Sequence, residues 1–377
     1  MNIPRVLRDQ IRDRLSTSPK AVILYGPRQT GKTTLVHSLI RELPYRTMSV
    51  NGEEERYRDV LMKKDVRALK SLVSGYDLLL IDEAQHVPDI GFTLKLLIDY
   101  VQNIKLIVTG SSSLDLASKV SEPLTGRKWT YTLYPIAFLE LKSLYNEFEL
   151  RDQKEERLIW GSYPEIFSLD GSEDRQKYLS ELARDYLFKD ILALGSIRNP
   201  IVLRNLLKLL AFQIGSEVSI REVASRLEAS KETVAHYIDL LEKAFIIFRL
   251  TGFSRNLRKE VTKMHKYYFY DLGIRNILID NVKPLSYRND HGALWENFLI
   301  IERMKRNAYK NVLYTPYFWR TYTGAEIDYV EDRGGALYGL ELKYSAKTAS
   351  PPASWLSTYP NGRFETVNQN NFLEFIL

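Results

Sequence analysis

The sequence contains no cysteine among its 377 residues. Disulfide bonds, zinc sites built from thiolates and a cysteine nucleophile are therefore excluded. No apolar run approaches the ~20 residues that a membrane-spanning helix needs. The first residues, Met1–Arg5, lead into a charged stretch without the apolar core of a signal peptide. We therefore expect a cytoplasmic protein with no membrane partner.

The excess of positive charge is small, with a formal net charge of +6 and an isoelectric point of about 9.1. A basic protein favours a polyanionic partner such as DNA, but a solvated basic surface explains so small an excess equally well. Hydrophobic residues make up 45% of the chain and charged residues 27%, which is ordinary for a folded protein. At roughly 100–200 residues per domain, the length predicts two or three domains.

Short apolar segments alternate with amphipathic helices in the first third of the chain. The segments at 21–25, 78–81 and 105–109 are almost continuously apolar, as strands are when a sheet is covered on both faces. This pattern predicts a parallel α/β sheet. The chain then becomes helical from about residue 136 to 215, for example at 175–194 and 202–212. Short helices and alternating aromatic strands (245–250 and 266–270) follow. The end of the chain has a helix at 293–307 and strands near 317–322, 326–331 and 337–343.

Residues 26–33 read Gly-Pro-Arg-Gln-Thr-Gly-Lys-Thr, which fits the P-loop pattern G-x-x-x-x-G-K-[ST]. The motif follows one apolar strand and opens a helix at 33–43, the context that its chemistry requires. Backbone N–H groups would cradle phosphates, Lys32 would neutralise them, and the hydroxyl of Thr33 would ligate Mg²⁺. The cofactors predicted here are ATP and Mg²⁺, and the predicted nucleotide-binding residues are Gly26, Pro27, Arg28, Gln29, Thr30, Gly31, Lys32, Thr33 and Thr34.

Two acids, Asp82 and Glu83, end the second apolar strand. Asp82 is expected to hold Mg²⁺, and Glu83 to act as the general base that polarises the attacking water. An Asp-Glu pair that starts a helix is the structural alternative. Thr109 ends the third strand, where it could contact the γ-phosphate or cap the next helix at 114–119.

Arg127 follows Gly126 after these strands. It could act on the nucleotide of a second copy in a homo-oligomer, as arginine fingers do. A surface position or an ion pair explains the same residue equally well.

Residues 219–244 predict a helix, a turn and a second helix. Together with the two aromatic strands they describe a winged helix, whose wing would be 252–265. The second helix of that fold can enter the DNA major groove, and basic wing residues would meet phosphates. Packing modules and protein docks use the same fold, so both interpretations stay open. The candidate DNA contacts are Ser230, Lys231, Thr233 and His236 on the helix, with Arg255, Arg258 and Lys259 in the wing. Arg249 and Lys266 are further basic residues around the two strands.

The chain resembles the AAA+-like ATPases of archaea and bacteria that carry a C-terminal domain of unknown function. The resemblance covers nearly the whole chain and includes the P-loop, residues 81–85, 109–111, 126–127 and 133–135, and the later segments 161–165, 268–273 and 319–321. It implies ATP binding and hydrolysis.

The last segment is similar to the PD-(D/E)XK nucleases through Asp328, Glu341 and Lys343, with Glu296 as the upstream helical acid. That similarity implies a second metal site made by these four residues, since two acids can share a metal that activates water. Ile327 stands where many of these nucleases have proline. The alternative is a nuclease fold used only for binding, with Glu341 and Lys343 as an ion pair.

We therefore predict an α/β protein in four parts. These are a P-loop ATPase core (residues 1–135), a helical lid (136–215), a winged helix (216–283) and an α+β domain similar to restriction endonucleases (284–377). ATP turnover would drive a change in a C-terminal half directed at DNA or at a protein client. The alternatives are a DNA-binding module whose ATP site is structural, and a metal-dependent nuclease gated by ATP.

Overall fold

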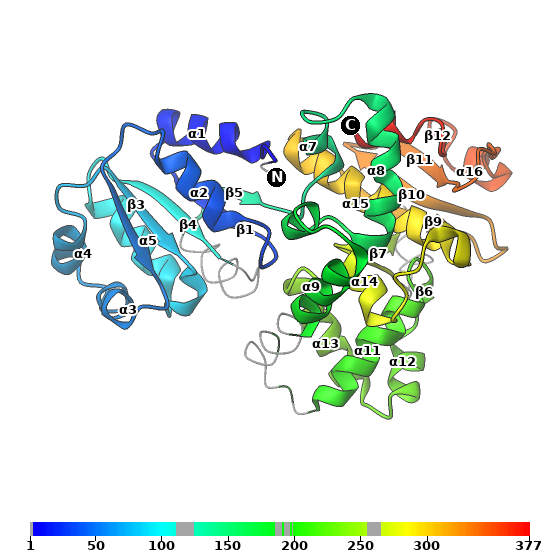
Figure 1. The fold of residues 1–377 in the computed structure, drawn as a ribbon, viewed down its shortest axis with the longest axis horizontal. Helices are drawn as coiled ribbons and strands as arrows, with labels where there is room; N and C mark the ends of the chain where they lie inside the picture. Colours follow the sequence, from blue (N-terminus) through cyan, green and yellow to red (C-terminus); the bar gives the residue numbers. More distant parts are fainter. Residues whose placement is uncertain (1–2, 111–123, 185–190, 192–196, 198, 255–264) are drawn as a thin grey trace. The chain divides into compact units, whose positions relative to one another are not determined.

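The computed structural model describes residues 3–110, 124–184, 191, 197, 199–254 and 265–377. The chain divides into two compact units (Figure 1). The first holds the chain up to Ile136 together with Lys243–Phe245, and the second holds the rest from Ala137 onward. The second unit contains nearly all of the three segments that were predicted as separate parts, 136–215, 216–283 and 284–377.

The first unit is built on a five-stranded sheet in the order β2-β3-β4-β1-β5, with every neighbouring pair parallel. This confirms the parallel α/β core. Strands β1 and β3 are buried along nearly their whole length, whereas β2 and β5 are partly exposed. The strands are β1 (Ala21–Tyr25), β2 (Thr47–Asn51), β3 (Leu78–Asp82), β4 (Lys105–Thr109) and β5 (Lys128–Thr132).

The helices of the first unit form two groups. Helix α1 (Leu7–Thr17) packs on α2 (Lys32–Ile40), and α3 (Glu55–Met62), α4 (Val66–Leu72) and α5 (Ile90–Tyr100) pack on one another. A short 3₁₀ turn, η1 (Ala84–His86), follows β3. Helix α2 begins one residue before the predicted start and ends three residues before the predicted end.

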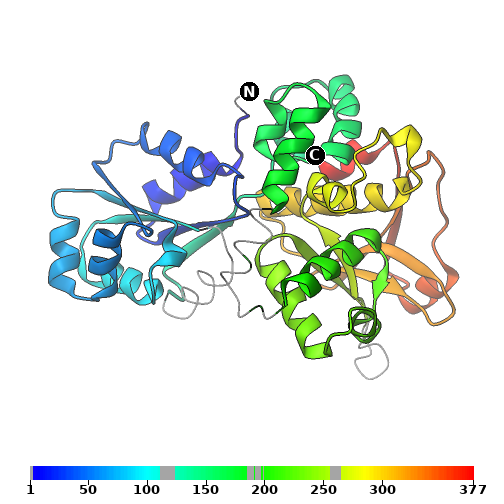
Figure 2. The same cartoon turned by 60° about the horizontal axis from the view of Figure 1, so that its bottom comes forward.

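The second unit contains a seven-stranded mixed sheet in the order β12-β11-β10-β9-β7-β8-β6 (Figures 1 and 2). Parallel pairing of β7 with β9 makes it one sheet across the predicted boundary at residue 283. The sequence therefore misses this junction, because the pairing joins strands that lie far apart in the chain. The strands are β6 (Glu217–Val218), β7 (Ile247–Gly252), β8 (His265–Phe269), β9 (Thr315–Arg320), β10 (Glu326–Arg333), β11 (Ala336–Leu342) and β12 (Arg363–Val367).

Helix α15 (His291–Tyr309) is the buried centre of the second unit. Two of its aromatic side chains, Trp295 and Phe298, pack with Phe138 and Phe372 from other elements. The remaining helices are α7 (Phe138–Leu141), α8 (Glu147–Trp160), α9 (Ser172–Arg184), α11 (Pro200–Phe212), α12 (Ile220–Arg226), α13 (Lys231–Lys243), α14 (Leu272–Leu278), α16 (Ala353–Thr358) and α17 (Phe372–Ile376), with 3₁₀ turns η2 (Pro164–Phe167) and η4 (Leu285–Tyr287).

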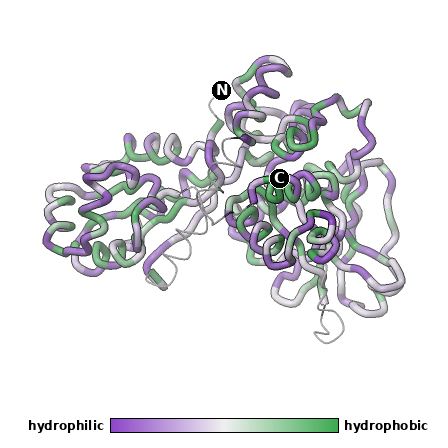
Figure 3. Tube along the Cα trace, turned by 90° about the horizontal axis from the view of Figure 1, so that it is seen from below, coloured by the Kyte–Doolittle hydropathy of each residue, from purple (hydrophilic) through white to green (hydrophobic). Residues whose placement is uncertain are grey.

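Hydrophobic and hydrophilic stretches are interspersed along the chain in both units (Figure 3). Within the described residues, no helix has the length and apolar character needed to cross a membrane.

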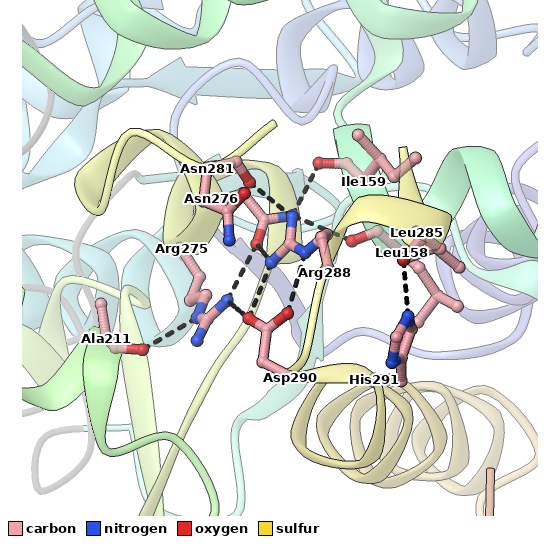
Figure 4. Close-up of polar contacts among 10 residues, drawn as sticks. All are labelled: Leu158, Ile159, Ala211, Arg275, Asn276, Asn281, Leu285, Arg288, Asp290 and His291. Carbon is pink, nitrogen blue, oxygen red and sulfur yellow. Dashed lines mark hydrogen bonds and ion pairs between the residues drawn. The ribbon is translucent and has the colours of Figure 1, made fainter. Parts of the chain in front are cut away.

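A buried ion cluster ties four elements of the second unit together (Figure 4). The carboxylate of Asp290 accepts hydrogen bonds from Arg275 at 2.5 Å and from Arg288 at 2.8 and 2.9 Å. Both guanidinium groups are almost fully buried. Arg275 also donates to the carbonyl of Ala211 at 2.8 Å, and Asn276 donates to two carbonyls at the end of α8. Helices α8, α11, α14 and α15 therefore share one polar centre.

We expect Asp290→Ala to destabilise the second unit by about 3–5 kcal/mol, because it leaves two buried cations without their carboxylate. Burial alone would raise the pKa of Asp290, but the hydrogen bonds from Arg288 and Arg275 outweigh it and hold that pKa below its usual value. The stability that the carboxylate contributes is thus complete above the unfolded-state pKa of about 3.9 and is lost as the pH falls through the lower native pKa.

Urea unfolding of the wild type and Asp290→Ala at several pH values checks this expectation. The exposed Glu365, for which the structure shows no side-chain partner, supplies the control variant Glu365→Ala. A difference between wild type and Asp290→Ala no larger than that of the control, or one that grows below pH 4, would contradict it.

Candidate active site

The P-loop connects β1 to α2 in a bend that depends on glycine. Gly26 has φ +149°, and a Cβ atom there would lie 2.1 Å from the carbonyl oxygen of Leu133. Gly31 has φ +88°, a left-handed conformation that favours glycine. No side chain caps the start of α2. Its first backbone N–H groups are therefore left for an anion.

The side chain of Lys32 folds back over the loop. Its Nζ donates to the carbonyl oxygens of Gly26 at 2.9 Å and Pro27 at 2.8 Å, and the residue is 6% exposed. Burial lowers the pKa of Lys32 to about 8, although the nearby carboxylates of Glu83 and Asp82 raise it in part. The ammonium group is thus largely charged at neutral pH and lies where the loop would meet a phosphate.

Asp82 joins the loop to two neighbouring strands. Its Oδ2 accepts a hydrogen bond from the hydroxyl of Thr33 at 3.0 Å, and its Oδ1 accepts one from the hydroxyl of Thr109. Thr109 reaches it because β3 and β4 pair in parallel and end at the same edge of the sheet. The structure therefore brings these three sequence-predicted residues together, and their roles stay predictions.

Glu83 follows directly, in a left-handed backbone conformation with φ +50°. Its carboxylate accepts a hydrogen bond from the side-chain amide of Gln85. The pair of acids does not start an α-helix, because β3 is followed by the short turn η1.

The other P-loop residues shape the bend. The buried hydroxyl of Thr30 donates to the carbonyl of Pro27 at 2.9 Å, Gln29 has φ +57°, and Thr34 is exposed. Arg28 lies near enough to Lys32 to lower its pKa.

No sequence motif points to Arg5, which donates to the carbonyl oxygens of Thr30 at 2.7 Å and Tyr134 at 2.6 Å. Arg5 therefore joins the loop to the chain that follows β5. Its partners lie far along the chain, so no local pattern reports the contact.

Arg127 lies at the other edge of this sheet. It directly precedes β5, whose first residue pairs with Ala21, whereas the loop begins after Tyr25 at the opposite end of β1. Its guanidinium pairs with Asp99 at 3.1 Å and is 44% exposed. The structural alternative, an ion pair, is thus present, and action on the nucleotide of a second copy stays a prediction.

The structure also brings Glu296, Asp328, Glu341 and Lys343 near one another in the second unit. Burial, followed by the charges of Glu296 and Glu341, raises the pKa of Asp328 to about 7. Yet no group of three or more acidic, histidine or cysteine side chains in the described part of the chain is arranged to hold a metal ion. Glu341 pairs with Lys343, and Glu296 contacts Tyr268 and Lys266. The second metal site stays a prediction.

The candidate DNA contacts on α13 are only partly available. Lys231 and His236 are exposed, whereas the hydroxyl of Thr233 bonds that of Ser230, whose oxygen also accepts the Thr233 N–H. Ser230 and Thr233 thus cap the helix. Arg255, Arg258 and Lys259 lie outside the described residues.

The two basic residues predicted beside the wing are held by acids. Lys266 is buried beside Glu326, and Arg249 pairs with Glu242 at 3.3 Å. The ammonium group of Lys266 therefore points into the protein.

Three family models match successive parts of the chain. They describe an AAA domain over residues 18–142, a domain of unknown function (DUF8612) over 151–285 and a second one (DUF4143) over 291–359. The uncharacterized protein Rv2008c of Mycobacterium tuberculosis is 30% identical over 349 residues, which cover 92% of this chain and 74% of that protein. This chain belongs to the same family. The AAA domain of the family contains the P-loop, Asp82 and Thr109.

Two more distant similarities were found. The uncharacterized protein MJ1544 of Methanocaldococcus jannaschii is 26% identical over 311 residues, which are 78% of this chain and 68% of that protein. Among solved structures, the Walker-type ATPase PABY2304 of Pyrococcus abyssi superposes with a TM-score of 0.49 and 16% identity, over 72% of this chain and 94% of that one.

Two of the later segments that resemble the family, 161–165 and 268–273, meet in the second unit. Asp271 accepts a hydrogen bond from the backbone of Ser162 at 2.6 Å. A Cβ at Gly161 would lie 2.1 Å from the Asp271 carboxylate, and one at Gly273 would lie 2.2 Å from the carbonyl oxygen of Trp160. These motifs therefore pack two helices closely together, which is a structural role that the sequence alone did not reveal.

Proposed function

We propose that this protein is a Mg²⁺-dependent ATP hydrolase whose turnover at the P-loop is coupled to its second unit. The observation that supports this is the convergence of Lys32, Thr33, Asp82 and Glu83 at one edge of the parallel sheet. Ligands of open α/β sheets bind at this edge, beyond the carboxyl ends of the strands. The AAA-domain match adds support, because it spans all four residues.

Thr33 and Asp82 would hold the metal ion. Their oxygen atoms lie 3.0 Å apart, and a hydroxyl with a carboxylate is the kind of oxygen pair that Mg²⁺ accepts beside phosphate and water. When bound, Mg²⁺ neutralises charge on the phosphates. Lys32 would leave the carbonyls of Gly26 and Pro27 and donate to phosphate oxygens, while the N–H groups at the start of α2 orient the phosphate chain.

Glu83 would accept a proton from the water that attacks the terminal phosphate. The hydrogen bond from Gln85 restrains the carboxylate. Proton transfer to a positioned carboxylate accounts for about 10²–10⁴-fold in rate in enzymes generally.

We expect Glu83→Gln to bind ATP as the wild type does and to hydrolyse it about 100-fold more slowly or worse, because the amide cannot accept the proton. Phosphate release and the affinity for a fluorescent ATP analogue measure the two properties. Glu55→Gln, an exposed change on α3, is the matched control. Normal turnover in Glu83→Gln would exclude Glu83 as the base.

Coupling of ATP turnover to the second unit would begin at residues 133–134, which follow β5 and contact the P-loop. The carbonyl of Leu133 lies against Gly26, and its N–H donates to the carbonyl of Tyr25 at 2.8 Å. Arg5 holds Thr30 of the loop and Tyr134 at once. A loop that changes shape around phosphate therefore displaces residues 133–134.

The other end of this connection is anchored in the second unit. The N–H of Phe138 donates to the buried carboxylate of Glu302 at 2.6 Å, and the N–H of Ala137 donates to Glu140 at 2.9 Å. Only a few covalently linked residues separate the two anchors. A displacement at Tyr134 would thus pass directly to α15, which carries Glu302.

DNA is the partner that we propose for the second unit. Helices α12 and α13, with the antiparallel pairs β6–β8 and β7–β8 at one end of the seven-stranded sheet, are the elements that would act as a winged helix. The exposed Lys231 and His236 on α13 could meet a phosphate and a base edge. Glu232 and Asp239 on the same helix oppose this, so the contact would be weak and dependent on salt.

We expect duplex DNA to raise the rate of ATP hydrolysis, and Lys231→Ala/His236→Ala to reduce this stimulation while the basal rate stays unchanged. The measurements are phosphate release with and without DNA, and DNA binding by fluorescence anisotropy at several salt concentrations. The exposed Lys283 gives the control Lys283→Ala. Equal stimulation in all three proteins would refute α13 as the contact, and no effect of DNA on any of them would favour a protein client.

A further inference from the structure

The second unit buries a lysine at the centre of its acidic cluster. Lys266 on β8 is 3% exposed. Its Nζ lies 2.5 Å from Oε1 of Glu326 on β10 and 3.5 Å from Oε1 of Glu296 on α15. The hydroxyl of Tyr268, two residues further along β8, donates to the same Glu296 oxygen at 2.5 Å. Strand β8 therefore presents a cation and a hydroxyl donor to the acids.

Strand geometry explains why Lys266 points inward. Alternate residues of a strand face the same side, so Lys266 and Tyr268 share a face. The pairing of β8 with β7, and of β7 with β9, makes β8 part of the sheet that carries Glu326. The ammonium group also lies 5.4 Å from the ring centre of Phe318 on β9. Lys266 is thus enclosed by the sheet rather than free to leave toward solvent.

The remaining charges of the cluster are already engaged. Oδ2 of Asp328 accepts the backbone N–H of Leu342 at 2.8 Å, and Glu341 pairs with Lys343. A bound Mg²⁺ or Mn²⁺ needs several oxygen ligands at about 2.0–2.2 Å around one point. A metal ion that bound both Glu296 and Glu326 would have to lie between their carboxylates. The Lys266 ammonium group occupies that position.

We propose that Lys266 is a built-in cation that takes the place of a divalent metal ion in this cluster. The ammonium group neutralises Glu296 and Glu326, holds β8 against α15 and β10, and keeps the site closed to metal. The domain then has the carboxylates that resemble a nuclease centre but lacks the metal on which phosphodiester cleavage depends. The inference is independent of the ATPase proposal, because no nucleotide takes part in it.

Charge and burial support this assignment. Burial by itself would lower the pKa of Lys266, but the charges of Glu296 and Glu326 raise it above the usual value. Lys266 thus stays charged at any physiological pH. Removing it would leave four acids, Glu296, Glu326, Asp328 and Glu341. The remaining cations are Lys343, which pairs with Glu341, and Arg320, which lies 4.0 Å from Glu326.

The test is Mn²⁺ binding by the nucleotide-free full chain, followed through the electron paramagnetic resonance signal of free Mn²⁺. We expect the wild type to show no stoichiometric site. Lys266→Met should gain one, with an affinity higher by about tenfold or more, because a like charge has left contact distance. Lys266→Arg, which keeps the charge, should behave as the wild type does, and Lys283→Met controls for the loss of a surface lysine.

Lys266→Met/Asp328→Asn should lose the gained site, which would locate it in this cluster. Mn²⁺ should also raise the melting temperature of Lys266→Met and leave that of the wild type unchanged. A folded Lys266→Met that binds no more Mn²⁺ than Lys283→Met would overturn the proposal.

If Lys266→Met does not fold, the wild type and Asp328→Asn decide the matter. A stoichiometric Mn²⁺ site that is present in the wild type and lost in Asp328→Asn would overturn the proposal. A wild type without such a site would support it.

Discussion

The carboxylate of Asp82 connects three parts of the candidate active site. It accepts hydroxyl hydrogen bonds from Thr33 on α2 and Thr109 on β4, while its own strand, β3, lies between β2 and β4 in the sheet. If that carboxylate were displaced, Thr33 and Thr109 would lose their shared hydrogen-bond acceptor. Glu83, the next residue, would move with it. The geometry of catalysis that we propose therefore depends on this group first, and on Lys32 second.

The two units balance their buried charges in different ways. In the first unit, Lys32 is buried against backbone carbonyls, so its ammonium group can exchange these neutral partners for phosphate. In the second unit, Arg275 and Lys266 are buried against carboxylates, so their charges are already matched. Charged groups with neutral partners suit ligand binding, whereas matched charges fix the structure. This contrast agrees with the proposal that the first unit carries the chemistry and the second a binding or responding role.

Much of the first unit could be predicted from the sequence. Strands β1, β3 and β4 are apolar runs, and the P-loop has a motif whose glycines and lysine each have a physical reason. Strands β2 and β5 were missed because each is partly exposed and contains polar residues.

In the second unit, prediction found most elements but not their assembly. The pairing of β7 with β9 and the insertion of Lys266 among the acids depend on residues far apart in the chain. The role of Arg5 was missed for the same reason, since its partner Tyr134 lies 129 positions away. Local patterns identify helices, strands and motifs, whereas the partners of buried charges are set only by the tertiary fold.

The nucleotide-dependent shift in melting temperature tests the central claim most directly. ATP with Mg²⁺ should stabilise the wild type, by about 2.7 kcal/mol at a nucleotide concentration 100 times the Kd. We expect the same shift in Lys70→Ala, where the substituted lysine is exposed on α4. Lys32→Ala should show none, because the loop would lose the charge that meets the phosphates. An equal shift in all three proteins would contradict the assignment of the nucleotide to this loop.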